Sequence, residues 1–328
     1  MSDIFVKQTA PPSPPLEIFL ATVQVHVLSA GHLTLPERHF VHPASDEARS
    51  TVPSLAFLIQ HENVETGQKT RIVFDLGLRR DLERYSEPIQ KHAATRQPIS
   101  TDPDVVKSLK AGGLTPDDID YVIYSHVHWD HVGEPRDFPS STFIVGPGAP
   151  DLLHGSSASL RGGHSFFESD LIPQDRTIEL SSPTSINTTD IGRKSSQKPG
   201  APSFHQQWTS HLNLPHVIDL FQDGSLYIVD APGHLPGHIN LLARTGPNER
   251  VYLAGDACHD RRILRKERTI GTWPDAEGYT CCIHANRSKA EETIECIREL
   301  ERQGIEVIFA HDVEWEQDPN NAGRFWGS

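Results

Sequence analysis

One stretch, Tyr121 to Gly133, constrains the fold more than any other part of the chain. It starts as a short apolar, β-rich run and ends in three imidazoles and one carboxylate within six positions. These side chains are His126, His128, Asp130 and His131. Residues two apart in an extended segment point the same way, so His126 and His128 are expected on one side. Imidazole and carboxylate groups bind zinc and similar divalent cations, so the stretch predicts a strand that delivers a metal site to a loop.

Chance has to be weighed, because the chain contains 19 histidines among its 328 residues. At that frequency, the pattern His-x-His-x-Asp-His should arise by accident on the order of 0.005 times in such a chain. We therefore interpret it as a metal site rather than a polar loop, provided that distant ligands complete it.

Three more short apolar runs are each followed by a residue of ligand type. These residues are His234, Asp256 and His311, after the runs 225–230, 251–254 and 305–309. Each is weak by itself, because Pro-Gly-His and Gly-Asp are common turns. Ligands at strand ends on one edge of a sheet can nevertheless converge when they are far apart in sequence. The shared arrangement predicts a single site.

Periodicity along the rest of the chain predicts further strands and a few helices. Strands are expected at 21–28, 55–61, 71–75, 141–145, 216–221 and 240–243. Helices are expected at 103–111, 147–153 and 286–303, the last amphipathic and ended by Gly304. Asp75, at a strand end, either caps the next turn or supports a ligand histidine.

The remaining segments are expected to be irregular. Residues 30–52 read as a loop that crosses the surface, either away from the site or over it, and its histidines (32, 39 and 42) are expected to be solvated; residues 260–286 also lack a pattern. Residues 1–17 are Pro-rich and expected to be disordered, and 18–328 are expected to form one domain. The Ser-, Gly- and Pro-rich stretch at about 155–213 is interpreted as an insertion, either disordered or a lid over the substrate. Four aromatic residues favour partial order against the site: Phe166, Phe167, Phe204 and Trp208.

Charge and cysteine content narrow the function classes. The net charge of −14 argues against nucleic acid and anionic membrane surfaces as partners. The four cysteines show no Cys-x-x-Cys spacing, so free thiols in a reducing compartment are expected. No signal peptide or run of 18 apolar residues is seen, and a cytoplasmic protein is expected.

Four motifs together resemble the metallo-β-lactamase superfamily. They are Ser-His-Val-His-Trp-Asp-His-Val-Gly (125–133), Ala-Pro-Gly-His-Leu-Pro-Gly-His (231–238), Ala-Gly-Asp-Ala (254–257) and Phe-Ala-His-Asp (309–312). The Pro-Gly-His doublet and the strand–helix–strand ending in the last histidine are most similar to the N-acyl-homoserine-lactone-lactonase-like branch. The resemblance implies an α+β fold, a four-layer αβ/βα sandwich in which two mixed sheets face each other with helices outside.

The resemblance also implies two Zn²⁺, or other divalent transition-metal ions, per chain. One ion would be held by His126, His128 and His234, and the other by Asp130, His131 and His311. Asp256 would bridge them, whereas His238 matches a structural position.

The chemistry of such a centre is consistent with hydrolysis. Two dications about 3.5–4 Å apart lower the pKa of a bridging water, and the resulting hydroxide attacks a carbonyl. The cations stabilise the oxyanion, and Asp130 would orient the hydroxide or pass a proton to the leaving group.

One position departs from that branch. Its lactonases place a tyrosine three residues beyond the bridging aspartate, where this chain has His259. That imidazole either donates to the oxyanion or forms part of the pocket wall, and the change weakens the expectation of homoserine-lactone specificity.

The expected function is a metal-dependent hydrolase that opens a cyclic ester or cyclic amide of a small metabolite or xenobiotic. The partner is a small molecule, and the chain is expected to be a monomer or homodimer. The alternative is a thioesterase or glyoxalase-II-like hydrolase, with a basic patch for its substrate. That patch would comprise Arg261, Arg262, Arg265, Lys266 and Arg268. An iron-containing electron-transfer member is disfavoured, because no flavodoxin-like second domain follows residue 328.

Overall fold

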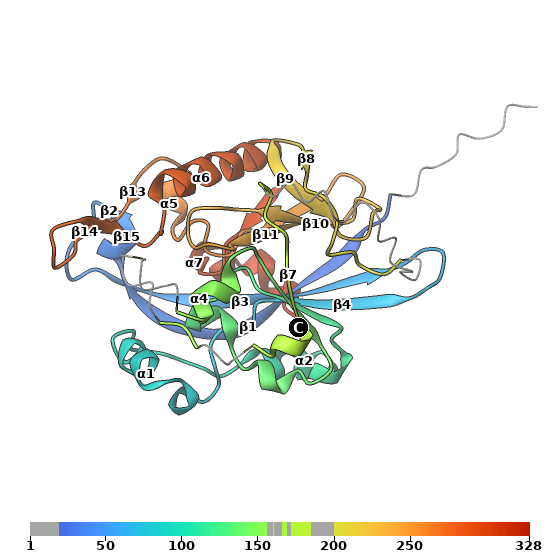
Figure 1. Ribbon diagram of the computed structural model, residues 1–328, viewed down its shortest axis with the longest axis horizontal. Coiled ribbons are helices and arrows are strands. Elements are labelled where there is room, and N and C mark those ends of the chain that lie inside the picture. The colour runs from blue at the N-terminus through green and yellow to red at the C-terminus, as the bar shows by residue number, and fades with distance from the viewer. Residues whose placement is uncertain (1–19, 156–159, 161–165, 169–171, 185–199) are drawn as a thin grey trace, which may run out of the picture.

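The computed structural model describes residues 20–155, 160, 166–168, 172–184 and 200–328 (Figure 1). Two six-stranded sheets form the centre of the molecule. The first has the order β1 (Val23–Pro36), β3 (Arg49–Glu62), β4 (Lys69–Phe74), β5 (Tyr121–Ile123), β6 (Thr142–Val145), β7 (Thr177–Glu179). The second has the order β16 (Glu306–Ile308), β12 (Arg250–Leu253), β11 (Ile239–Arg244), β10 (Leu226–Asp230), β9 (Leu214–Asp219), β8 (Thr209–His211). Both sheets mix parallel and antiparallel pairs.

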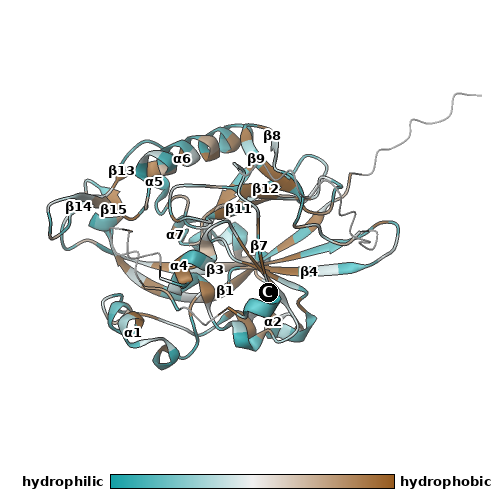
Figure 2. Cartoon of the chain, in the orientation of Figure 1, coloured by the Kyte–Doolittle hydropathy of each residue, from teal (hydrophilic) through white to brown (hydrophobic). Residues whose placement is uncertain are grey.

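The two sheets pack face to face around one apolar core. Phe57 and Phe74 of the first sheet share this core with Ile228, Leu241 and Leu253 of the second. Apolar residues are concentrated on these strands (Figure 2). All five are at most 2% exposed, so both faces are sealed from water and cannot slide past each other without losing apolar burial.

Helices cover the outer faces of the sheets. In Figure 1, α1 (Glu87–Ala94) and α2 (Val105–Ala111) lie beside the first sheet, and α5 (Arg261–Leu264) and α6 (Arg287–Arg302) lie over the second. The predicted four-layer αβ/βα sandwich is therefore confirmed. The other short helices are α3 (Trp129–Val132), α4 (Ala149–Leu153) and α7 (Val313–Gln317). The 3₁₀ turns are η1 (Glu37–His39), η2 (Leu82–Arg84), η3 (Pro116–Asp118), η4 (Pro135–Asp137), η6 (Gln174–Arg176) and η7 (Pro319–Arg324).

The sequence of α6 explains its position. The Asn286 side chain accepts from the backbone N–H of Lys289 and caps the first turn. Ile294, Ile297 and Leu300 recur at helical spacing and are buried against the second sheet. No helix in the described part of the chain is both long and apolar enough to cross a membrane.

Two segments that we expected to be irregular are partly regular, and that prediction was wrong. Within 30–52, β1 runs on to Pro36, because a bulge between Ser29 and His32 carries the strand past its glycine. Within 260–286, α5 is followed by strands of two small two-stranded sheets. They pair β13 (Thr269–Ile270) with β2 (Val41–His42), and β14 (Thr272–Pro274) with β15 (Thr280–Cys282). These strands are two or three residues long, too short to show a periodic pattern.

The stretch predicted as an insertion is only partly described. Its residues 172–184 and 200–213 supply β7 and β8, which extend the two sheets at their edges. Phe204 is buried in the central core, and Trp208 packs against it. Phe166 and Phe167 instead lie beside the site described below. The rest of the stretch, and the Pro-rich residues 1–17, lie outside the described residues.

Candidate metal centre

Strand register brings the ligand-type residues to one edge of the sandwich. Phe74 pairs with Ile123 in parallel, and Leu253 pairs with Ile308 in parallel, so each pair of strands ends at the same level. The two sheets also meet here, because the N–H of Ile239 donates to the carbonyl of Ser125 at 2.8 Å. Side chains that follow these strand ends therefore converge from both sheets.

The stretch after β5 turns sharply to present its four candidate ligands. His128 is extended and precedes α3, a single helical turn that carries Asp130 and His131. Gly133 ends the turn with φ 48°, and a Cβ there would lie 2.6 Å from the Cβ of Leu76. Only glycine fits this close, left-handed exit, so the sequence signal at this position has a direct structural cause.

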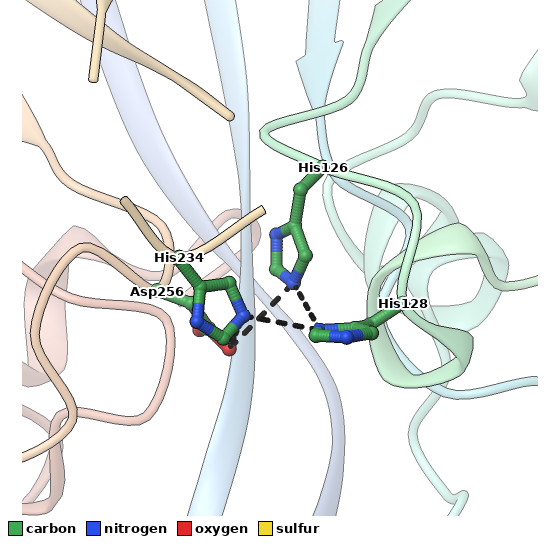
Figure 3. A group of neighbouring side chains, drawn as sticks. All are labelled: His126, His128, His234 and Asp256. Carbon is green, nitrogen blue, oxygen red and sulfur yellow. Dashed lines mark hydrogen bonds and ion pairs between the residues drawn. The ribbon is translucent and has the colours of Figure 1, made fainter. Parts of the chain in front are cut away.

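A first cluster consists of His126, His128, His234 and Asp256 (Figure 3). Their ligand atoms all lie within 4.8 Å of one another. Nδ1 of His128 is 2.9 Å from Nε2 of His126 and 3.0 Å from Nε2 of His234. Three imidazole nitrogens that face a common point are a donor set for a divalent transition-metal ion.

A second cluster consists of Asp130, His131 and His311, all buried. Nε2 of His311 is 3.6 Å from Oδ2 of Asp130. His311 is fixed through its other nitrogen, because Nδ1 donates to the carbonyl of Pro53 at 2.7 Å. This fixed tautomer leaves Nε2 as the nitrogen that faces the cluster.

Asp256 lies between the two clusters and faces each with a different oxygen. Its Oδ2 is 3.7 Å from Nε2 of His126 and 3.5 Å from Nε2 of His234. Its Oδ1 is 3.3 Å from Nε2 of His131 and 3.4 Å from Nε2 of His311. All seven predicted metal-ligand residues therefore come together, in the two groups that the resemblance implied.

The buried polar atoms fit a divalent cation. Oδ1 of Asp256 and Nε2 of His131 are buried and have no hydrogen-bond partner among the described residues. Leaving such atoms unsatisfied in a protein interior costs free energy. A cation held between them and their neighbours would remove that cost.

Electrostatics in the centre favour positive charge beside Asp256. Burial, followed by the neighbouring imidazoles, holds the pKa of His126 and His234 well below its ordinary range, so both imidazoles are neutral. Burial also disfavours a charged His131, but Asp256 and Asp75 outweigh it and raise the pKa of His131 well above its ordinary range. The same negative potential attracts divalent cations, which displace protons from the imidazoles when they bind.

Two further residues hold the centre in place. Asp75 accepts from the N–H of Ser125 at 2.7 Å with Oδ1, and its Oδ2 contacts Nδ1 of His131 at 3.0 Å. Of the two roles left open for Asp75, support of a ligand histidine is the one observed. His238 contacts the carbonyl of Ala231 at 3.1 Å, and its Nε2 accepts from the N–H of Asp256 at 3.1 Å. It fixes the backbone of Asp256 and is absent from both clusters.

His259 lies at the rim of the first cluster. Its Nε2 is 3.0 Å from Oδ2 of Asp256, and its ring contacts those of Phe40 and His284. His284 is buried and forms a third possible donor group with His234 and His259. Sequence reasoning missed His284, because it follows a three-residue strand that gave no periodic signal.

A cavity of 270 Å³ opens onto both clusters. Candidate ligands on its wall are His128, Asp130, His234, Asp256 and His311, and His259 lines it as well. The remaining wall is largely apolar and aromatic. It comprises Leu33, Leu35, Phe40, Trp129, Phe166, Trp273 and Ile283, together with His39, His92 and Arg96. A small molecule with an apolar body would fit this space.

The basic residues after the site are mostly paired with carboxylates. Arg261 binds Asp312 at 2.7 Å, and Arg262 binds Glu37 at 2.9 Å. Arg265 and Lys266 pair with Glu314 and Glu295. Most of the charge of the expected basic patch is thus neutralised within the fold.

Comparison with known proteins places these observations in a family context. The family model described as metallo-beta-lactamase superfamily matches residues 49–311. Metallo-hydrolase mfmC of Annulohypoxylon moriforme is 33% identical over 94% of this chain and 84% of its own length. Gamma-lactamase FDB1 of Fusarium pseudograminearum is 30% identical over 73% of this chain and 54% of its own length.

Some relatives are much longer. The match to cytochrome P450 monooxygenase mpaDE′ of Penicillium brevicompactum is 28% identical over 94% of this chain but only 35% of that protein. The chain therefore spans about a third of the length of such relatives.

Solved structures share the fold. A variant of AiiA from B. thuringiensis, with N-decanoyl-L-homoserine bound at its active site, superposes with a TM-score of 0.61. It is 18% identical, and the match covers 90% of this chain and 96% of AiiA.

Proposed function

Because this chain belongs to the metallo-beta-lactamase superfamily, we propose that it is a dinuclear metal-dependent hydrolase that opens a lactone or lactam ring in a small molecule. One observation carries the proposal: the two carboxylate oxygens of Asp256 face two separate donor clusters on the wall of one cavity. The similarity to a gamma-lactamase supports a cyclic amide as one substrate class.

In this proposal each cluster holds one cation. His126, His128 and His234 would hold the first. Asp130, His131 and His311 would hold the second, and Asp256 would offer one oxygen to each; Zn²⁺ is the ion that such imidazole-rich sets suit best. When bound, the cations polarise the substrate carbonyl and lower the pKa of a water molecule, so that hydroxide forms near neutral pH.

The chain's own residues orient the reactants and move the proton. Asp130 lines the cavity and directs Oδ2 towards His311, so its other carboxylate oxygen can accept a proton from the attacking water and return it to the leaving oxygen or nitrogen. His259 contacts Asp256 through Nε2. When Asp256 serves as a ligand, this N–H becomes available to the oxygen of a bound carbonyl. The apolar wall limits the water that reaches the ring.

The basic patch expected for the thioesterase alternative is largely committed within the fold, because Arg261, Arg262 and Arg265 pair with carboxylates. Thioester hydrolysis remains one outcome of the substrate test.

A substrate screen tests the proposed function. Protein stripped with EDTA and reloaded with Zn²⁺ should open simple lactones or lactams, and the stripped protein should not. Turnover of thioesters alone would overturn the assignment.

His128→Ala should abolish turnover, with a loss of at least about 10³-fold, because it removes a cluster ligand. The fold should persist, since His128 lies outside the apolar clusters, and circular dichroism and a melting curve check this. The matched control is His205→Ala, an exposed histidine that lines neither cluster nor the cavity. Substantial activity in His128→Ala would contradict the mechanism.

A further inference from the structure

One charged side chain on the cavity wall has no role in the proposed chemistry. Arg96 is the only lysine or arginine among the described residues that line the cavity. It makes no hydrogen bond or ion pair through its side chain within the described part of the chain. Most other arginines near the site, such as Arg79 and Arg261, have carboxylate partners.

The backbone holds Arg96 firmly in place. It follows α1, and its N–H donates to the carbonyl of Ala93 at 2.8 Å. Its own carbonyl accepts from the N–H of Thr34 on β1 at 2.9 Å. The guanidinium is thus presented from a junction between α1 and the first sheet, and little main-chain entropy would be lost when it binds a ligand.

No carboxylate among the described residues pairs with the guanidinium of Arg96 at close range. Burial lowers the pKa of Arg96, yet guanidinium stays charged at any physiological pH. The imidazole next to it is neutral, because burial and then Arg96 lower the pKa of His92 to about 4. Asp130 is the carboxylate that acts on Arg96 at a distance, and it belongs to the second cluster. A half-buried cation without a close partner is costly unless a ligand supplies the anion.

We propose that Arg96 is a specificity residue that binds a carboxylate carried by the substrate, separate from the ring that is opened. This inference rests on the proposed function. The planar guanidinium fork matches a carboxylate with two parallel hydrogen bonds. The aromatic walls formed by Phe40, Trp129, Phe166 and Trp273 would hold the apolar body between Arg96 and the metal centre. The substrate class is therefore a small, flat lactone or lactam with one additional carboxylate.

A matched pair of small probes tests the charge preference without any turnover. Benzoate and benzamide have the same ring and nearly the same shape, and only benzoate is anionic. Binding can be followed by quenching of tryptophan fluorescence, because Trp129 and Trp273 line the cavity. Each probe is titrated into EDTA-stripped protein, so that a carboxylate cannot bind to metal ions. Wild-type protein should bind benzoate at least about tenfold more tightly than benzamide.

Two variants assign the preference to the side chain. Arg96→Met should bind both probes equally, and Arg96→Lys should keep part of the preference, since it retains the charge but loses the fork. The control is Arg38→Met, which removes a positive charge from the neighbouring η1, where Arg38 pairs with Asp46 outside the cavity lining. It should leave the preference unchanged.

Several results would overturn the inference. They are equal affinity of wild-type protein for the two probes, an unchanged preference in Arg96→Met, or a lost preference in Arg38→Met. If Arg96→Met does not fold, the wild-type comparison and Arg96→Lys still decide.

Turnover then separates this inference from the proposed function. Zn²⁺-loaded protein is given dihydrocoumarin-6-carboxylate and its carboxamide. If wild-type protein has a lower KM for the acid than for the carboxamide, Arg96→Met does not, and kcat is similar for the two compounds, both the role of Arg96 and the proposed function are supported. Hydrolysis of both compounds with equal KM contradicts the role of Arg96 alone. Benzoate preference with no hydrolysis of any lactone or lactam contradicts only the proposed function.

Discussion

Asp75 illustrates how a residue that is not a ligand can control the centre. It lies directly after β4 with φ 62°, a conformation that aspartate and asparagine tolerate better than most residues. From there it binds both Ser125 and His131, and so fixes the loop and the ring that face the second cluster.

Asp75→Asn keeps the backbone conformation but removes the charge that orients His131. The affinity for the cation of the second cluster should fall about 10–100-fold, because an aligned, negatively charged partner raises the basicity of a ligand histidine. Competition with a chromophoric chelator measures this affinity. Asp151→Asn, an exposed change on α4, should leave it unaltered. An unchanged affinity in Asp75→Asn would show that Asp75 has no such role.

At the residue scale, the sequence correctly predicted which side chains come together at the site when the candidate ligand directly follows a strand. His126, Asp256 and His311 all do so, and parallel register then fixes their level. It failed for His284 and Arg96, which lie after a very short strand and after α1. Their positions depend on how distant segments pack, which no local pattern records.

At the scale of elements, β1 is held to α7 by a single polar contact. Nε2 of His32 is 2.8 Å from Oε1 of Glu316, although the two are 284 positions apart. We expected His32 to be a solvated loop histidine, and that was wrong. The bulge that prolongs β1 places His32 opposite Pro53 on β3 and brings it to α7.

This contact predicts a pH-dependent contribution to stability. The hydrogen bond to Glu316 raises the pKa of His32, although partial burial acts in the opposite direction. A raised folded-state pKa stabilises the fold below about pH 6.5, the unfolded value, and the effect is lost as pH rises through the folded-state pKa. His32→Ala should therefore cost about 0.5–1 kcal/mol more at pH 5.5 than at pH 9.

Urea unfolding of EDTA-treated protein at the two pH values measures this difference. Glu316→Gln should remove the same pH dependence. A cost of His32→Ala that is the same at both pH values would contradict the role of the pair.

The helix α6 was predictable from its long apolar period, whereas α1 and the small strands β13 to β15 were not. The amphipathic pattern of α6 was sufficient, because its buried face is decided by hydrophobic spacing alone. The helix α1 has only two buried residues, Ile89 and Ala93, so its period is weak. The small strands depend on pairing rather than on their own sequence, because β13 pairs with β2, and β14 and β15 pair with each other.

At the scale of the whole molecule, the candidate metal centre lies where the two sheets meet and takes residues from both. Four candidate ligands come from the loop after β5 of the first sheet. The other three, His234, Asp256 and His311, follow β10, β12 and β16 of the second sheet. The sandwich must therefore be assembled before the site exists. The backbone of Leu55 on β3 also donates to the carbonyl of Ala310 at 2.9 Å, which ties the sheets together beside His311.

The fold class was predictable because four motifs fix where strands must end, whereas the cavity was not. Its wall is built from β1, η1, α1 and the hairpin segments 272–283, whose mutual positions follow from tertiary packing. Substrate selectivity is therefore the property that the sequence patterns specify least.

The central claim is that two cations, bridged by Asp256, are required for ring opening. The most direct measurement is the rate of lactone or lactam hydrolysis as EDTA-stripped protein is titrated with Zn²⁺. We predict that activity is absent at the start, rises, and saturates at two equivalents per chain, and that Asp256→Ala does not recover it. Saturation at one equivalent, activity in the stripped protein, or full activity of Asp256→Ala would contradict the account.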